Sequence, residues 1–222
     1  MTYPLLASGR DADVFALGED TVLRRYRDGS DASREAALMR YVAAAQNYPV
    51  PTVHSAAGAD LVMERLDGPT MSHAVESGRL DPWKAGHTLA DLHERLHRIP
   101  GRSAGTDGQR VVHLDLHPEN VMLLARGPVV IDWRNARDGD PALDVALSAL
   151  ILAQVAVDPT EDRAGIAGTV LAAFADESRV DPALRLDDAL AFRAADANIS
   201  PAERDRLPAA GALVRAGGGA PA

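Results

Sequence analysis

The chain has 222 residues, of which 46% are hydrophobic, with no cysteine and a formal net charge of -9. That length can bury a core in one compact domain or in two small lobes. The lack of cysteine excludes disulfides and thiol catalysis, and the acidic balance argues against nucleic-acid binding, which requires a basic surface. An acidic surface suits solubility or a cationic substrate.

The sequence predicts neither a signal peptide nor a membrane-spanning helix. The opening stretch MTYPLLASGRDADVF has no basic segment followed by a long apolar one, so we expect no signal peptide. The longest apolar run, residues 145–157, is too short to span a bilayer and reads as a buried helix. We therefore expect a cytoplasmic protein without a membrane partner.

The first part of the chain alternates in the manner of strands. Residues 13–26 predict a hairpin around the turn 18–20, and residues 30–47 predict a helix that opens with Ser and Asp cap candidates. Residues 51–57 and 59–66 predict two further strands around Gly58. Residues 1–66 should form a lobe with a small antiparallel sheet and one helix.

The rest of the chain, residues 67–222, predicts a mostly helical lobe. A helix is expected over 81–99, with Asp81 as N-cap and Pro82 in the first turn. From residue 141 the pattern is helical almost to the end. The fold class is therefore α+β, in two lobes.

One stretch of this second lobe, VVHLDLHPENVMLL (residues 111–124), places polar groups between apolar runs. If strands 120–124 and 129–133 pair across the loop 125–128, Asn120 lies opposite Trp133 and next to Asp132, with Asp115 just upstream. These are hard oxygen ligands, which suit Mg²⁺ together with substrate phosphates. The alternative is that Asp115 and Asn120 only cap turns.

HLDLHPEN followed by VVIDW resembles the catalytic loop and metal-binding Asp of the protein-kinase-like fold, and most closely its aminoglycoside phosphotransferase and small-molecule kinase branch. The resemblance implies that Asp115 is the catalytic base and that Asn120 and Asp132 are Mg²⁺ ligands. It implies a structural role for His113, and a hydrogen bond from the catalytic loop to Asp144.

The resemblance extends back to the first lobe, with departures. Arg24 stands where the family has its phosphate-gripping Lys, and Glu35 on the first helix would pair with it. Arg keeps the charge, but its planar fork is not equivalent to an ammonium group. The glycine-rich loop is reduced to Gly9 in ASGRDADVF.

The stretch LVMERLDG resembles the linker between the lobes. By that resemblance the Glu64 carbonyl and the Leu66 amide bind the adenine edge, with Met63 behind the base. Residues 133–143 are too few for the activation segment of a protein kinase, which argues for a small substrate.

The function implied is Mg²⁺-dependent transfer of the γ-phosphoryl group of ATP or GTP to a hydroxyl of a small molecule, aminoglycoside-like or another metabolite and possibly cationic. Given Gly9 and Arg24, the alternative is a nucleotide-binding pseudokinase with weak catalysis.

A second motif competes with this interpretation. HERLH (His93, Glu94 and His97) matches the H-E-x-x-H helix of zinc hydrolases. A catalytic zinc usually has three protein ligands, and no third His follows at the expected place. His113, Asp115 and His117 could also form a metal cluster, but this would leave Asn120 and Asp132 unexplained.

Overall fold

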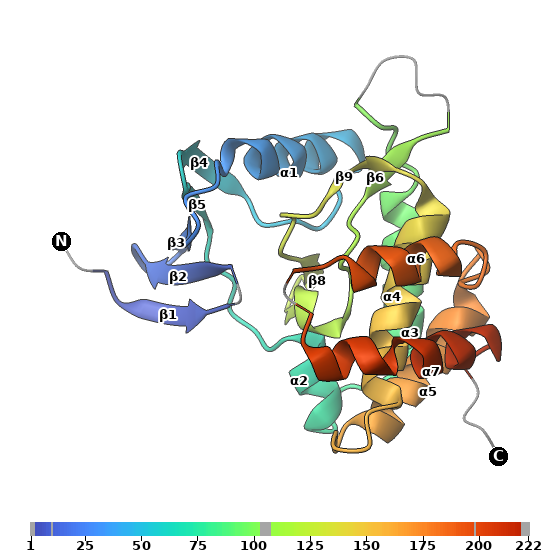
Figure 1. The fold of residues 1–222 in the computed structure, drawn as a ribbon. Coiled ribbons are helices and arrows are strands. Elements are labelled where there is room, and N and C mark those ends of the chain that lie inside the picture. The colour runs from blue at the N-terminus through green and yellow to red at the C-terminus, as the bar shows by residue number, and fades with distance from the viewer. Residues whose placement is uncertain (1–2, 10, 103–107, 198, 219–222) are drawn as a thin grey trace.

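The computed structural model describes residues 3–9, 11–102, 108–197 and 199–218. A five-stranded sheet and one helix form the N-terminal part, and helices form most of the C-terminal part, with two short two-stranded ribbons between them (Figure 1). The predicted α+β architecture is confirmed.

The N-terminal sheet is antiparallel throughout. Its strands are β1 (Leu5–Ser8), β2 (Ala12–Ala16), β3 (Thr21–Tyr26), β4 (Val53–Ala57) and β5 (Asp60–Glu64), in the order β1-β2-β3-β5-β4. The predicted hairpin is the pair β2–β3, and the predicted strands around Gly58 are β4 and β5. The edge strand β1 was not predicted, because all its residues are exposed and it carries no alternation.

Helix α1 (Ser33–Gln46) packs against β4 and turns Glu35, Leu38 and Met39 inward. Its N-cap is Ala32, without a side-chain cap bond, so the predicted Ser/Asp cap is wrong in detail. The carboxylate of Asp31 instead accepts a hydrogen bond from the Ser33 amide at 3.0 Å.

The C-terminal part is built around one apolar helix. The helices are α2 (Met71–Glu76), α3 (Pro82–Leu96), α4 (Pro141–Ala156), α5 (Ala164–Glu177), α6 (Leu186–Ala194) and α7 (Pro201–Arg215). Helix α4 is covered by α5, α6 and α7, which explains why its sequence is mostly apolar. The predicted N-cap of α3 is confirmed, since the Asp81 carboxylate accepts from the Lys84 amide at 3.1 Å.

Helices α3 and α5 approach each other closely at Gly86. A Cβ at this position would lie 2.5 Å from the Val170 carbonyl oxygen and 2.5 Å from the Ala173 Cβ. Only glycine lets the two helices pack at this separation, which fixes α3 against α5.

The two ribbons carry the polar stretch. Strand β6 (Arg110–Val112) pairs with β9 (Arg137–Gly139), and β7 (Val121–Leu124) pairs with β8 (Gly127–Val130) after the 3₁₀ turn η1 (Pro118–Asn120). The strands β6 and β9 and the helix α2 are short and were not predicted.

The predicted register of the β7–β8 hairpin is wrong by two residues. Leu124 pairs with Gly127 instead of Val129, because residues 125 and 126 alone form the turn and Gly127 takes a φ of 110° that favours glycine. Pro128 faces Leu123, whose amide donates to the Pro69 carbonyl at 2.8 Å, so no ladder bond is lost to the proline. The Ile131 amide donates to the Asn120 carbonyl at 2.9 Å, so Asn120 lies opposite Ile131, and Trp133 lies beyond the strand.

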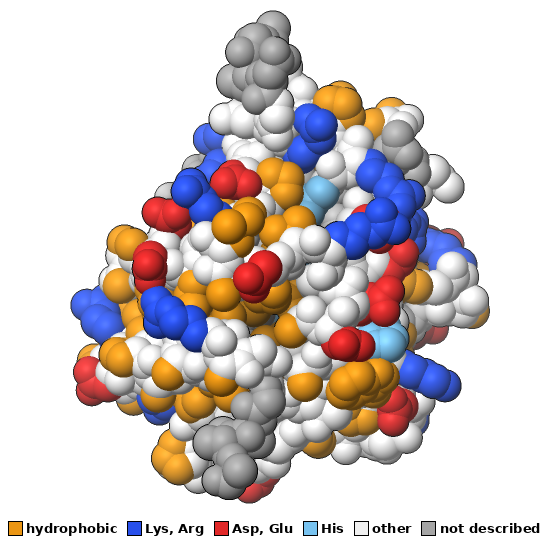
Figure 2. Space-filling view, turned by 90° about the vertical axis from the view of Figure 1, so that its right-hand side faces the viewer, with side chains coloured by type: hydrophobic (Ala, Val, Ile, Leu, Met, Phe, Trp, Pro, Cys, Tyr) orange, Lys and Arg blue, Asp and Glu red, His pale blue; other side chains and the backbone are white. Residues whose placement is uncertain are grey.

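The helical side of the molecule carries acidic and basic side chains in mixture, as Figure 2 shows. In the part of the chain that the structure describes, no helix is long and apolar enough to cross a membrane.

Candidate active site

The segment from His113 to Asp115 is held by hydrogen bonds to Asp144 on α4. The buried Asp144 carboxylate accepts hydrogen bonds from the backbone amides of His113 at 3.0 Å and Leu114 at 2.6 Å. Leu114 has a φ of 65°, a conformation that costs a non-glycine residue about 1–3 kcal/mol. The carboxylate therefore holds the backbone in the strained form that presents Asp115, as expected for Asp144.

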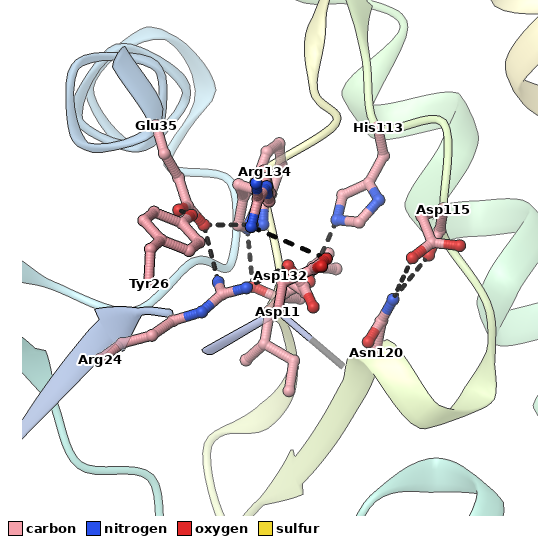
Figure 3. A network of polar contacts seen from close by, with 12 residues as sticks. Asp11, Arg24, Tyr26, Glu35, His113, Asp115, Asn120, Asp132 and Arg134 are labelled. Carbon is pink, nitrogen blue, oxygen red and sulfur yellow. Dashed lines mark hydrogen bonds and ion pairs between the residues drawn. The ribbon is translucent and has the colours of Figure 1, made fainter. Parts of the chain in front are cut away.

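Asn120 and Asp115 lie side by side (Figure 3). The Asn120 amide nitrogen donates to the Asp115 carbonyl at 2.8 Å and to the Asp115 carboxylate at 3.2 Å. The same nitrogen lies 3.2 Å from His117 Nε2, which must accept since an amide nitrogen only donates. Burial lowers the pKa of His117 in spite of the nearby Asp115, which keeps the ring neutral at pH 7.

Across from this pair lies Asp132, in an ion pair with Arg24 at 2.5 Å. The same guanidinium contacts Glu35 at 2.9 Å, so the predicted Arg24–Glu35 pair is confirmed. Burial alone would lower the pKa of Arg24, but the carboxylates of Asp132 and Glu35 outweigh it and raise that pKa. Burial likewise opposes ionisation of Asp132, yet the charge of Arg24 keeps its pKa below the usual range.

Glu35 has more partners than the sequence indicated. Burial raises its pKa even though Arg24 acts in the opposite direction. One carboxylate oxygen accepts from the Trp133 amide at 3.0 Å, and the other accepts from the Tyr26 hydroxyl. Glu35 therefore does more than pair with Arg24, because it also ties α1 to the residue after Asp132.

Two residues of this network, Tyr26 and Arg134, were not predicted from the sequence. Tyr26 could have been found, because it lies two residues after Arg24 on the same strand face. Arg134 stacks over the Tyr26 ring at 4.6 Å and pairs with Asp28 at 2.6 Å and with Asp11 at 3.8 Å. No local pattern links Arg134 to Asp28 and Asp11, which lie more than 100 residues away in the sequence.

His113 behaves as a structural residue. Its Nε2 lies 3.1 Å from the Ile131 carbonyl, to which it donates, and its ring packs edge-on against Trp133 at 4.9 Å. It thus connects the loop before Asp115 to the segment that carries Asp132.

The oxygen atoms of this site fit a hard divalent cation. Because the Asn120 amide nitrogen forms hydrogen bonds with Asp115 and His117, the amide oxygen of Asn120 points away from these two residues. One carboxylate and one amide oxygen, completed by phosphate oxygens, form a typical Mg²⁺ ligand set.

The remaining sequence-predicted residues lie at the rim of the sheet. Met63 and Glu64 end β5, and Leu66 follows where the chain leaves for α2. The Glu64 carboxylate accepts from Arg126 at 2.5 Å and from the Thr52 amide at 3.1 Å. Gly9 lies between β1 and β2, with its amide donating to the Ala12 carbonyl at 2.9 Å. Their nucleotide contacts stay predictions.

The three residues of the HERLH motif bind other protein groups instead of converging on one metal site. His93 is buried, with Nδ1 donating to the Leu89 carbonyl at 2.8 Å and Nε2 accepting from Ser148 at 2.9 Å. His97 Nε2 contacts the Asp144 carboxylate at 2.9 Å, and Glu94 pairs with arginines. Among the described residues, no group of three His, Asp or Glu side chains is arranged to hold a metal. This arrangement argues against the zinc interpretation and against a His113–Asp115–His117 cluster.

The fold is that of the protein-kinase-like phosphotransferases. It resembles an ADP-bound aminoglycoside phosphotransferase, 15% identical, with a TM-score of 0.59 over 96% of this chain and 92% of that one. It resembles an ethanolamine kinase of Plasmodium vivax, 10% identical, with a TM-score of 0.61 over 97% and 84% of the chains. A macrolide 2'-phosphotransferase from Brachybacterium faecium is 19% identical, with a TM-score of 0.53 over 100% and 93% of the chains.

The family itself is shown by sequence. The model of the phosphotransferase enzyme family (APH) matches residues 2–111 and 106–183, and the chain belongs to this family. No curated protein sequence matches the chain. The sequence-based recognition of the family is confirmed, and the chain stands among small-molecule phosphotransferases.

Proposed function

We propose that the chain transfers the γ-phosphoryl group of ATP or GTP to a hydroxyl of a small molecule in the presence of Mg²⁺. The observation that carries this proposal is the convergence of Asp115, Asn120 and Asp132 with the cation of Arg24 (Figure 3). Such a set of groups suits phosphoryl transfer, which depends on positioning and charge stabilisation.

In this proposal Asp115 orients the acceptor hydroxyl and takes its proton. The hydroxyl oxygen forms the new bond to the γ-phosphorus, and the bond from that phosphorus to the β-phosphate oxygen breaks, releasing ADP or GDP. Asn120 and Asp132 would hold Mg²⁺, which neutralises phosphate charge when bound. Arg24, fixed by Glu35, binds the phosphates.

The two parts of the chain divide the work. Residues 1–66 bind the nucleotide, through Gly9 over the phosphates and through Met63, Glu64 and Leu66 around the base. Residues 67–222 supply the catalytic groups and the acceptor site, with Asp144 and His113 supporting the loop that carries Asp115.

The test is a panel of hydroxyl compounds that includes aminoglycosides, read by ADP or GDP formation. Asp115→Ala should abolish transfer while the affinity for Mg²⁺-nucleotide, measured by calorimetry, stays near that of the wild type. Asp91→Ala, at an exposed Asp on α3, is the control and should retain turnover.

Turnover of Asp115→Ala close to the wild-type rate would refute the role of Asp115. A wild-type protein that binds Mg²⁺-nucleotide but turns over no compound of the panel would be the pseudokinase alternative instead.

A further inference from the structure

A small apolar cavity of about 60 Å³ lies beside the segment that carries Asp115. Its walls are apolar side chains of α2, α4 and α5, and one wall is His117 and Pro118. The apolar residues of these helices are Val75, Ile151, Leu152, Val155, Ile166, Ala167 and Val170. The lining runs from residue 72 to residue 170, so no strand of the five-stranded sheet contributes to it.

The rim of this cavity is charged. Arg163 Nη1 lies 3.2 Å from Glu76 on α2 and 3.0 Å from Glu119 in η1. Arg163 Nε lies 3.1 Å from Glu161. Three carboxylates thus surround one guanidinium, which leaves an excess of negative charge beside the apolar interior. All four side chains are partly exposed, so these pairs can exchange partners at modest cost.

We propose that this cavity is an acceptor subsite for an amphiphilic cation, a hydroxyl compound that carries an apolar group and a protonated amine. The apolar group enters the cavity, and the ammonium group pairs with Glu76 and Glu119 in place of Arg163. A cavity of about 150 Å³ holds a benzene ring, so this smaller one takes a branched alkyl group rather than a ring. A polycation without an apolar part does not satisfy these walls.

The cavity lies next to the proposed chemistry. His117 forms part of its wall, and His117 Nε2 is 3.6 Å from the Asp115 carboxylate. His117 thus contacts both the cavity and Asp115, and in the proposal a short spacer carries the hydroxyl of the ligand past this imidazole ring to the carboxylate. The inference in this form rests on the function proposed above.

Three probes test the two halves of the proposal, the apolar group and the positive charge. They are 2-(isobutylamino)ethanol, its neutral ether analogue 2-isobutoxyethanol, and 2-(methylamino)ethanol, which lacks the branched alkyl group. Titrations followed by ligand-observed NMR should give the isobutyl amine an affinity at least about tenfold higher than that of the methyl amine, because its three additional carbon atoms are buried. The ether should bind more weakly than the amine.

Variants locate the binding. Ala167→Val on α5 narrows the cavity and should remove the preference for isobutyl over methyl, whereas Ala175→Val on the same helix, outside the cavity lining, should keep it. Glu76→Gln combined with Glu119→Gln changes only partly exposed side chains and should remove the preference for the amine over the ether. This second variant tests the site even if Ala167→Val fails to fold.

Equal affinities of the isobutyl amine, the ether and the methyl amine for the wild type would overturn the proposal, as would preferences unchanged in both variants. ADP formation with the same probes separates the two proposals. Preferential binding without ADP from any hydroxyl compound refutes the phosphotransferase function and leaves the cation site. ADP formation without preferential binding refutes only the site.

Discussion

Asp144→Asn is the substitution that best tests how the fold presents Asp115. The buried carboxylate accepts from the His113 amide, the Leu114 amide and His97 Nε2. Burial alone would raise the pKa of Asp144, but the hydrogen bond from His97 and the neighbouring imidazole and amide groups hold it below the usual range. The group is therefore ionised, and an uncharged isostere removes both charge and one acceptor.

The cost follows from the hydrogen bonds. An asparagine keeps one acceptor oxygen, so its amide nitrogen faces either the His113 or the Leu114 amide and leaves a buried donor unpaired, which costs about 1–3 kcal/mol. With about 2 kcal/mol lost, the melting temperature should fall by roughly 4–8 °C for a chain of this size. Leu114 then loses part of what holds its left-handed backbone. A displacement of Asp115 by about 1 Å would lower kcat/KM by about a hundredfold.

The assay compares melting temperature with kcat/KM, corrected for the folded fraction. Ser148→Ala is the matched control: Ser148 is equally buried on α4 and bonds His93, but it does not touch the loop. It should lower stability by a similar amount and leave kcat/KM nearly unchanged. The reasoning is refuted if Asp144→Asn keeps wild-type kcat/KM, or if Ser148→Ala loses as much activity.

Four further outcomes are expected. Asp132→Ala should abolish Mg²⁺-dependent nucleotide binding, because it removes the carboxylate of the proposed metal site; unchanged affinity in calorimetry contradicts this. Arg24→Ala, Glu35→Ala and their double variant should give non-additive losses of kcat/KM, with a coupling of roughly 0.5–3 kcal/mol; additive losses argue for another phosphate-binding cation. Burial lowers the pKa of His93 to about 4, so the unfolded chain, with a pKa near 6.5, binds more protons between those values. The contribution of His93 to the free energy of unfolding should therefore be fully present above about pH 6.5 and fall by about 3 kcal/mol towards pH 4. In denaturant titrations at several pH values, the free energy of unfolding of His93→Gln should depend less on pH than that of the wild type. Gly86→Ala should lower the free energy of unfolding by about 1–3 kcal/mol through overpacking against α5, and an unchanged melting temperature would contradict the close approach.

The elements that the sequence predicted correctly are those with local signals. The alternation in β2 and β3 and the capped start of α3 come from neighbouring residues, and they appear in the structure. Strands β6 and β9 pair across 24 intervening residues, from 113 to 136, and have three residues each, too few for a periodic pattern. The register of β7 on β8 was missed for a different reason, since the φ of one residue, Gly127, decided it.

In the site, too, residues within a local motif were predicted, whereas contacts between residues far apart in the sequence were not. The sequence supplied Asp115, Asn120 and Asp132 through the family resemblance. In the structure Asn120 bonds Asp115, and Asp132 follows Ile131, which lies opposite Asn120 (Figure 3). The sequence did not supply the contact between Asp132 and Arg24, which are 108 residues apart. Nor did it reveal that His97, noticed as a possible zinc ligand, instead supports Asp144.

Glu35 shows why such distant contacts matter for the chemistry. Its carboxylate joins Arg24 on β3 to the Trp133 amide, one residue after Asp132, so strand, helix α1 and the loop of Asp132 meet at one buried group. Removing Arg24 leaves Glu35 with its bonds to Tyr26 and Trp133, whereas removing Glu35 breaks all three connections at once. Glu35→Ala should therefore be the more destabilising single change. Because Arg24 pairs with Asp132 and Glu35 accepts from the amide of the next residue, the position of the proposed metal ligand depends in part on where α1 lies against the sheet.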